Sequence, residues 1–274
     1  MKILKMTFQS NYDGPREYPL SRSGYLIGLS IILASAYSQY LTKGFGPILA
    51  LLIVYGVPVS VASFLFGPAI VRKAFSHTYT ALKFGLGLFG IFSLLGILTA
   101  SAIFSVIVMM DPQAANLLQK PNPVLHVPHE FAWIMVWLSL LLVGPAEEYV
   151  FRGFVYGGLL RLFKNRHWLS LAFFSSLLFA AAHLYYALVY GIASLALFTE
   201  LLAIGMALAV TYYLSGGNLF IPAIIHGLYD ASGFMSVAVS QEVGILLRMS
   251  MMLAGIVVAL ALFARVIWPQ RPRQ

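Results

Sequence analysis

The chain of 274 residues is 60% hydrophobic and only 9% charged, with a mean hydropathy of +0.87. Soluble domains carry about 25% charged residues, so this composition excludes an ordinary soluble protein and indicates one integral membrane domain. Cysteine is absent, which excludes disulfides, thiolate chemistry and cysteine-type metal sites. The net charge of +8 is explained by anchoring to anionic lipid headgroups, so nucleic-acid binding is not expected.

Long apolar stretches follow one another along the whole chain. A helix that crosses the hydrocarbon core needs roughly 20 mostly apolar residues. By that measure the sequence predicts an all-α membrane protein with about eight transmembrane helices, separated by segments such as TKGFGP and SGGN. The predicted helices cover residues 24–41, 47–71, 81–110, 131–163, 168–184, 192–214, 219–239 and 243–268.

Basic residues are concentrated in alternate loops. They are frequent before the first predicted helix, after the second and fourth, and after the last. The other loops hold few, chiefly Lys43, Lys120 and Arg248. The positive-inside rule therefore predicts an even number of membrane crossings, with both termini in the cytoplasm.

Few ionisable side chains are predicted to lie in the membrane interior, away from the loops and the helix ends. They are Glu147, Glu148, Arg152, His183, Glu200, His226 and Asp230. Singly, each has a structural explanation, because a Glu–Arg pair can hold helices together and a buried histidine is often a satisfied core residue. Together they form a functional-site hypothesis, since burying charge in a membrane is costly. For Glu200, a place in a cavity and a pairing with another buried group are equally consistent with the sequence.

Helical spacing indicates which of these groups can meet. Glu148 and Arg152 are four residues apart, with the acid first, which favours an ion pair on one helix face. Glu147 lies about 100° further around the helix and can point elsewhere. Pro145 cannot donate a backbone hydrogen bond, so we expect a kink or break just before Glu147 and a new helical segment there.

The same spacing recurs on two later helices. His226 and Asp230 are four residues apart, so the carboxylate can orient the imidazole or share a ligand with it. Phe179 and His183 repeat the interval, and the three alanines between them allow a neighbouring helix to approach closely.

Three short motifs carry a family resemblance. EEYVFR (147–152) matches EExxxR, FAAAH (179–183) matches FxxxH, and HGLYD (226–230) matches HxxxN/D. Their order resembles the CPBP family of intramembrane proteases, also called the ABI or type II CAAX prenyl endopeptidase family. That family includes Ras-converting CAAX endopeptidases and bacteriocin-processing or immunity proteins. The resemblance covers roughly residues 130–240.

The resemblance implies roles for seven residues around an intramembrane catalytic cavity. Glu147 corresponds to the general base that activates water, and His183 to its partner at that water. His226 and Asp230 correspond to the positions that stabilise the oxyanion. The supporting positions are Glu148, Arg152 and Phe179.

Position 230 departs from the CAAX endopeptidases of the family, which often have asparagine there. An ionised aspartate cannot donate to an oxyanion, so Asp230 must be protonated or must orient His226. No cofactor is needed for catalysis by glutamate-activated water, which we favour. The alternative is a metalloprotease in which Glu147, His183 and His226 hold Zn²⁺ together with a water.

The resemblance also divides the chain and predicts its partners. The expected division is a cytoplasmic segment (1–23), N-terminal transmembrane helices (24–129), the catalytic core (130–240), the last helix (241–268) and a basic cytoplasmic tail (269–274). The expected partners are the lipid bilayer and a peptide or protein substrate at the membrane, with or without a prenyl group. In a prokaryote the protein would lie in the cell membrane.

Two other classes of function fit parts of the pattern. One is a non-proteolytic scaffold or regulator, such as a bacteriocin-immunity protein, that binds a membrane partner. The other is a proton-coupled transporter, because buried glutamate and histidine also form proton relays. Inverted repeats with paired broken helices would favour a transporter, whereas only one break, at Pro145, is expected here.

Overall fold

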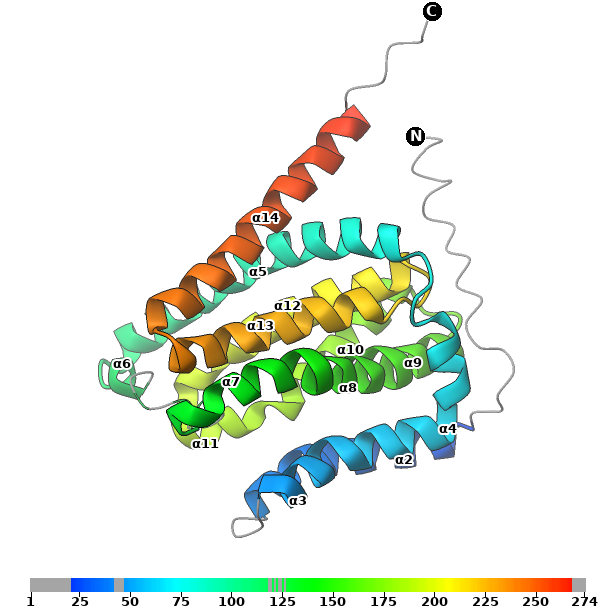
Figure 1. Cartoon of the computed structure of the whole chain (residues 1–274), viewed down its shortest axis with the longest axis horizontal. Coiled ribbons are helices and arrows are strands. Elements are labelled where there is room, and N and C mark those ends of the chain that lie inside the picture. Colours follow the sequence, from blue (N-terminus) through cyan, green and yellow to red (C-terminus); the bar gives the residue numbers. More distant parts are fainter. Residues whose placement is uncertain are drawn as a thin grey trace, which may run out of the picture.

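The computed structural model describes residues 21–41, 47–117, 120, 122, 125 and 127–267. Within these residues every regular element is a helix, which confirms the all-α prediction (Figure 1). Lys43, the residues before 21 and the predicted basic tail lie outside the described part of the chain.

Helices are present at each of the eight predicted places. The α-helices are α2 (Arg22–Leu41), α3 (Pro47–Leu51), α4 (Val57–Lys73), α5 (Thr78–Met110), α6 (Ala114–Leu117), α7 (His129–Leu138), α8 (Gly144–Glu148), α9 (Gly157–Leu162), α10 (Trp168–Ala182), α11 (Ala187–Tyr190), α12 (Ser194–Leu214), α13 (Phe220–Ala238) and α14 (Gln241–Ile267). The π-helical stretches are η1 (Leu52–Gly56), η2 (Ser139–Val143) and η3 (Tyr149–Tyr156). The short 3₁₀ turns are η4 (Leu184–Tyr186) and η5 (Gly191–Ala193).

Five helical stretches of the described residues are long and apolar enough to cross a membrane. They are Leu49–Gly67, Thr78–Met110, His129–Leu162, Trp168–Leu214 and Gln241–Arg265. The chain is therefore an integral membrane protein. Trp168–Leu214 covers two of the predicted helices, and α2 and α13 are not among the five, so a total of eight crossings and the side on which the termini lie stay predictions.

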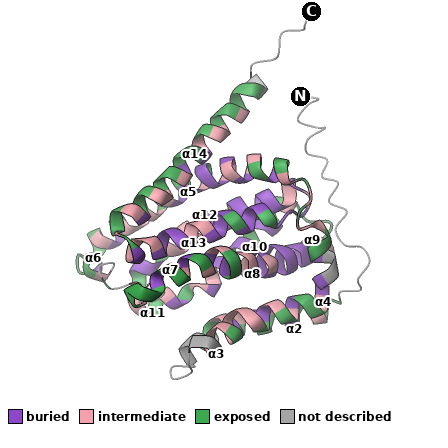
Figure 2. Ribbon diagram, in the orientation of Figure 1, coloured by how far each residue is buried: buried purple, intermediate pink, exposed green. Residues whose placement is uncertain are grey.

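The helices form a bundle with a central group and two flanks. In Figure 1, α7–α9, α10, α12 and α13 lie at the centre, with α5 and α14 on one side and α2–α4 on the other. Buried residues gather on the central helices, whereas α14 and α2 present exposed residues outward (Figure 2). Phe64 and Met110 are 90% and 81% exposed. Such apolar side chains suit a surface that faces lipid.

The helix that carries the first motif has no break before Glu147, but a new α-helical segment begins there as predicted, because α8 starts at Gly144 with Pro145 in its first turn. The chain stays helical from His129 to Leu162, and π-helical stretches lie on both sides of α8. In the first of them the Gly144 N–H donates to the Ser139 carbonyl, five residues back. This wider turn directly precedes Pro145 and takes the place of a break. Such π-bulges are frequent at functional sites.

Two glycines let α8 and α13 touch. A Cβ on Gly144 would lie 2.7 Å from the carbonyl oxygen of Ala223, and a Cβ on Gly227 would lie 2.7 Å from that of Ser139. Real Cβ atoms do not tolerate such distances, so only glycine permits this approach. The contact brings the glutamates of α8 within reach of His226, the neighbour of Gly227.

Candidate active site

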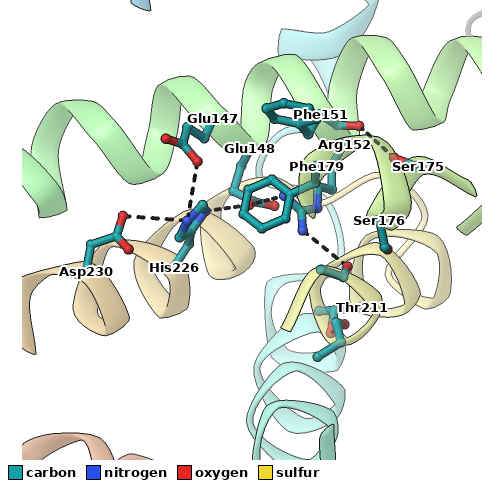
Figure 3. Close-up of polar contacts among 12 residues, drawn as sticks. Glu147, Glu148, Phe151, Arg152, Ser175, Ser176, Phe179, Thr211, His226 and Asp230 are labelled. Carbon is teal, nitrogen blue, oxygen red and sulfur yellow. Dashed lines mark hydrogen bonds and ion pairs between the residues drawn. The ribbon is translucent and has the colours of Figure 1, made fainter. Parts of the chain in front are cut away.

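A buried charge network links the first and third motifs (Figure 3). Glu148 Oε1 accepts a hydrogen bond from Arg152 NH1 at 2.7 Å, which confirms the pairing expected from their spacing. The same oxygen lies 2.8 Å from Nδ1 of His226, which donates to it. Arg152 also donates to the Gly205 carbonyl of α12 at 3.2 Å. Since these side chains are buried, Glu148 fixes both the arginine and the imidazole.

The other imidazole nitrogen of His226 faces two carboxylates. Its Nε2 lies 3.5 Å from Glu147 Oε2 and 3.5 Å from Asp230 Oδ2. Glu147 Oε2 is buried and has no hydrogen-bond partner among the described residues. Figure 3 shows Glu147 and Asp230 approaching the imidazole while Glu148 contacts its other nitrogen. Glu148, and not Asp230, therefore makes the short hydrogen bond that orients His226.

The second motif lies beside this network without a direct hydrogen bond to it in the described residues. His183 ends α10, and its Nδ1 donates to the Phe179 carbonyl at 2.8 Å. In the neutral imidazole this leaves Nε2 as an acceptor. The Phe179 ring packs on the Arg152 guanidinium at 4.7 Å and edge-on to the His226 ring at 5.5 Å. Phe179 thus separates the two histidines and supports the buried arginine.

Two cavities meet at these groups. One of about 200 Å³ is lined by Glu147, His183, Glu200, His226, Asp230 and Arg248, among others. A second of about 110 Å³ is mostly apolar, with Ile32, Val54, Pro58, Val150 and Phe151 among its lining residues. Tyr55, Glu147, His183 and Tyr185 line both. The predicted catalytic residues are therefore accessible from a shared space inside the bundle.

Several residues of the cavity were not singled out from the sequence. Tyr55 comes from η1, before the motifs, and is a hydrogen-bond partner of Glu147. Tyr229 donates to Glu200 Oε1 at 2.7 Å, so Glu200 both lines the cavity and has a partly buried partner. Arg248, which the sequence assigned to a loop, lies on α14 and lines the cavity. Nothing in the local sequence distinguishes these tyrosines from those that face lipid.

The residues considered for zinc do not gather into one cluster in the described part of the chain. Among the described residues, no group of three or more histidine, aspartate or glutamate side chains is placed to hold one metal ion. Glu147 and His226 approach each other, while His183 donates from Nδ1 to the Phe179 carbonyl and keeps Nε2 as an acceptor. The arrangement instead supplies an unpartnered carboxylate oxygen, an oriented imidazole and a second imidazole around one cavity. These are the groups that water activation and oxyanion stabilisation require.

The comparison with protein families identifies the part of the chain that holds the site. Residues 129–232 match the family described as type II CAAX prenyl endopeptidase Rce1-like. No curated protein and no solved structure matches the chain. The matched segment begins at α7 and extends into α13, so it contains Glu147, His183, His226 and Asp230. We conclude that residues 129–232 are a domain of the Rce1-like family.

Proposed function

We propose that the protein is a CAAX-type intramembrane endopeptidase that hydrolyses a peptide bond with water activated by Glu147. One observation carries this proposal. The Glu147 carboxylate has a buried oxygen without a hydrogen-bond partner in the described residues, beside a histidine and at a cavity within apolar helices. This free oxygen can accept a proton from water, which is what a general base does.

The neighbouring groups have separate tasks in this mechanism. Glu147 takes a proton from water, and the acceptor nitrogen of His183 helps to position that water. His226 acts as an imidazolium, in which Nδ1 donates to Glu148 and Nε2 donates to the developing oxyanion. Asp230 faces the same Nε2 and supports the donor form of the imidazole there. The proton held by Glu147 then passes to the amine that leaves as the peptide bond breaks.

The two cavities suit a lipidated peptide. The polar cavity would hold the chain around the cleaved bond, and the apolar one would hold a hydrocarbon group attached next to it. Because both adjoin Glu147, a prenylated cysteine on one side of the bond would place its lipid in the apolar cavity. This is the substrate class that the family's description suggests.

The basic residues support an orientation for the enzyme. Arg22, Arg161, Lys164 and Arg166 lie around one depression at one end of the bundle. By the positive-inside rule this end faces the cytoplasm, which is the side predicted for both termini.

Peptide cleavage by the purified protein in proteoliposomes tests the proposal. Wild type should cut a fluorogenic peptide ending in a CAAX sequence, with a farnesylated peptide cut faster, and mass spectrometry should place the cut after the cysteine. Cleavage should continue with a zinc chelator and stop in Glu147→Gln, which also excludes a contaminating protease. If folded wild type leaves every peptide intact, the scaffold explanation is favoured. If chelation abolishes cleavage, a metal must replace the glutamate mechanism.

A further inference from the structure

A depression lined by basic side chains lies at one end of the bundle. Arg22 begins α2, Arg161 lies in the last turn of α9, and Lys164 and Arg166 lie in the turn that follows α9. All four line one hollow, called the basic depression below, and no acidic residue of the described chain lines it with them. The basic depression shares no lining residue with the two cavities at the candidate active site.

The part of the basic depression that follows α9 is held in a defined shape. Arg161 is half-buried, and its guanidinium lies 5.8 Å from the centre of the Phe66 ring of α4. The backbone N–H of Arg166 donates to the Phe163 carbonyl at 2.9 Å, which closes the turn. The cations of this turn therefore surround a hollow whose backbone is already folded.

The start of α2 is fixed beside the same helix. The hydroxyl of Tyr25, three residues after Arg22, is buried and donates to the Val155 carbonyl of η3 at 2.8 Å. A Cβ on Gly158 would clash with the Tyr25 ring, so glycine permits this close approach. Arg22 is thereby placed opposite the turn after α9, although about 140 residues separate the two in sequence.

Three of the four cations lack a partner. The side chains of Arg22, Lys164 and Arg166 are exposed, and none has a hydrogen-bond or ion-pair partner among the described residues. Like charges gathered around one hollow repel each other, so an anion that enters it would be favoured.

The described chain offers no such anion at this end. Its three exposed acidic residues are Asp111, Glu130 and Glu242, which follow α5 or lie in the first turns of α7 and α14. These helix ends lie at the opposite end of the bundle from α9 (Figure 1). The anion that suits the basic depression therefore comes from another molecule.

The surroundings of the basic depression favour a lipid over a soluble phosphate compound. Leu26 is four residues after Arg22, on the same face of α2, and is 59% exposed. Phe163 lines the basic depression and is also exposed. A molecule whose phosphate lies among the cations can thus extend hydrocarbon chains along an apolar helix face. Basic pockets between membrane helices bind the headgroups of anionic lipids in this way.

We propose that the basic depression binds the phosphate group of an anionic phospholipid, which joins the start of α2 to the turn after α9. Arginine and lysine supply charge-assisted hydrogen bonds to its phosphate oxygens. Ile32 and Ala36 of α2 line the apolar cavity, so the bound lipid would help to hold one wall of that cavity. The inference does not rest on the proposed function, because binding is measured without cleavage.

The test compares three ligands that separate the headgroup from the hydrocarbon chains. Purified full-length protein in a neutral detergent is titrated with dioctanoyl phosphatidylglycerol, dioctanoyl phosphatidylcholine or glycerol 3-phosphate, and native mass spectrometry gives the apparent Kd. Phosphatidylcholine has the same chains without net charge, and glycerol 3-phosphate has the phosphate without chains. Phosphatidylglycerol should bind at least roughly tenfold more tightly than either.

Two triple variants separate the basic depression from the general charge of this end. A basic residue near an anionic headgroup contributes roughly fivefold to binding. Replacing Arg22, Lys164 and Arg166 together by glutamine should therefore weaken binding of phosphatidylglycerol by roughly a hundredfold. The control removes the same charge from α4 and α5 and should change the Kd by less than about threefold, because salt screens distant charges. Its substitutions are Arg72→Gln, Lys73→Gln and Lys83→Gln.

Folding of the variants is checked separately. The three replaced side chains of the basic depression are exposed, so the melting temperature without lipid should equal that of wild type. A second variant, with Arg22→Lys and Arg166→Lys, keeps every charge and should bind phosphatidylglycerol within about fivefold of wild type. Its loss of binding to the level of the glutamine variant would contradict a site based on charge.

Three other results overturn the inference. Equal losses of affinity in the two triple variants would mean that the lipid responds only to overall charge. Equal affinity for phosphatidylcholine and phosphatidylglycerol would remove recognition of the headgroup. Equal affinity for glycerol 3-phosphate and phosphatidylglycerol would assign the basic depression to a soluble phosphate compound. A wild type that cleaves no peptide would overturn the proposed function and leave this inference intact.

Discussion

The two adjacent glutamates should respond differently to replacement by glutamine. Glu148→Gln should lower the stability of the fold, whereas Glu147→Gln should remove activity and leave the stability nearly unchanged. Glu148 is fully buried, and one of its oxygens accepts hydrogen bonds from both Arg152 and His226. Glu148→Gln removes the negative charge and leaves the guanidinium buried, with the Gly205 carbonyl as its remaining acceptor among the described residues. Glu147 Oε2 has no hydrogen-bond partner among the described residues, so Glu147→Gln removes little stabilisation.

The expected difference in stability between the two variants follows from the burial of the Glu148–Arg152 ion pair. Removing one partner of a buried ion pair costs about 3–5 kcal/mol, because the other charge is left uncompensated. For chains of this size 1 kcal/mol shifts the melting temperature by about 2–4 °C, so Glu148→Gln should lower it by roughly 6–20 °C. Glu147→Gln should shift it by less than about 4 °C and remove activity instead.

Thermal unfolding in detergent, followed by intrinsic fluorescence, measures both variants under one condition. A double-mutant cycle makes the test specific to the pair. Arg152→Met should be strongly destabilising alone and much less so in the Glu148→Gln background, with a coupling of about 1 kcal/mol or more. Equal melting temperatures for the two glutamine variants would refute the assigned roles. Additive effects in the cycle would refute the ion pair as a stabilising unit.

Three further substitutions test the surroundings of the site. Gly227→Ala places a Cβ 2.7 Å from the Ser139 carbonyl, so unfolding measurements should show a loss of about 1–3 kcal/mol, and an unchanged stability would contradict the close helix contact. Tyr55→Phe removes a hydrogen-bond partner of Glu147, so kcat should fall about tenfold while the melting temperature stays the same. A variant with the wild-type kcat would exclude Tyr55 from the site. Phe179→Leu removes the ring that packs on the His226 imidazole, so both stability and kcat should fall, and a drop in neither would deny Phe179 its supporting role.

The sequence predicts the contacts that depend on one helix. The four-residue interval predicts the pair of Glu148 with Arg152, and the structure has it at 2.7 Å. The same interval brings Asp230 towards His226, at 3.5 Å. These predictions succeed because 3.6 residues per turn fix which side chains share a face.

Contacts between different helices could not be predicted from the spacing of residues within one helix. The hydrogen bond from His226 to Glu148 joins residues 78 positions apart, and local spacing carries no information about it. The wide turn before Pro145 and the position of Arg248 in the cavity also depend on packing between helices. Proline indicated only that the backbone must change there, and a single arginine near a predicted loop is ordinarily solvated.

The oxygen source in a single turnover tests the central claim most directly. Excess enzyme in ¹⁸O-labelled water is allowed to cleave the peptide once, and the product and the enzyme are examined by mass spectrometry. Water activated by Glu147 attacks the carbonyl itself, so one ¹⁸O should enter the new C-terminal carboxylate and none should enter Glu147. Label in Glu147 with an unlabelled product carboxylate would mean that the glutamate attacks as a nucleophile, and would contradict the account.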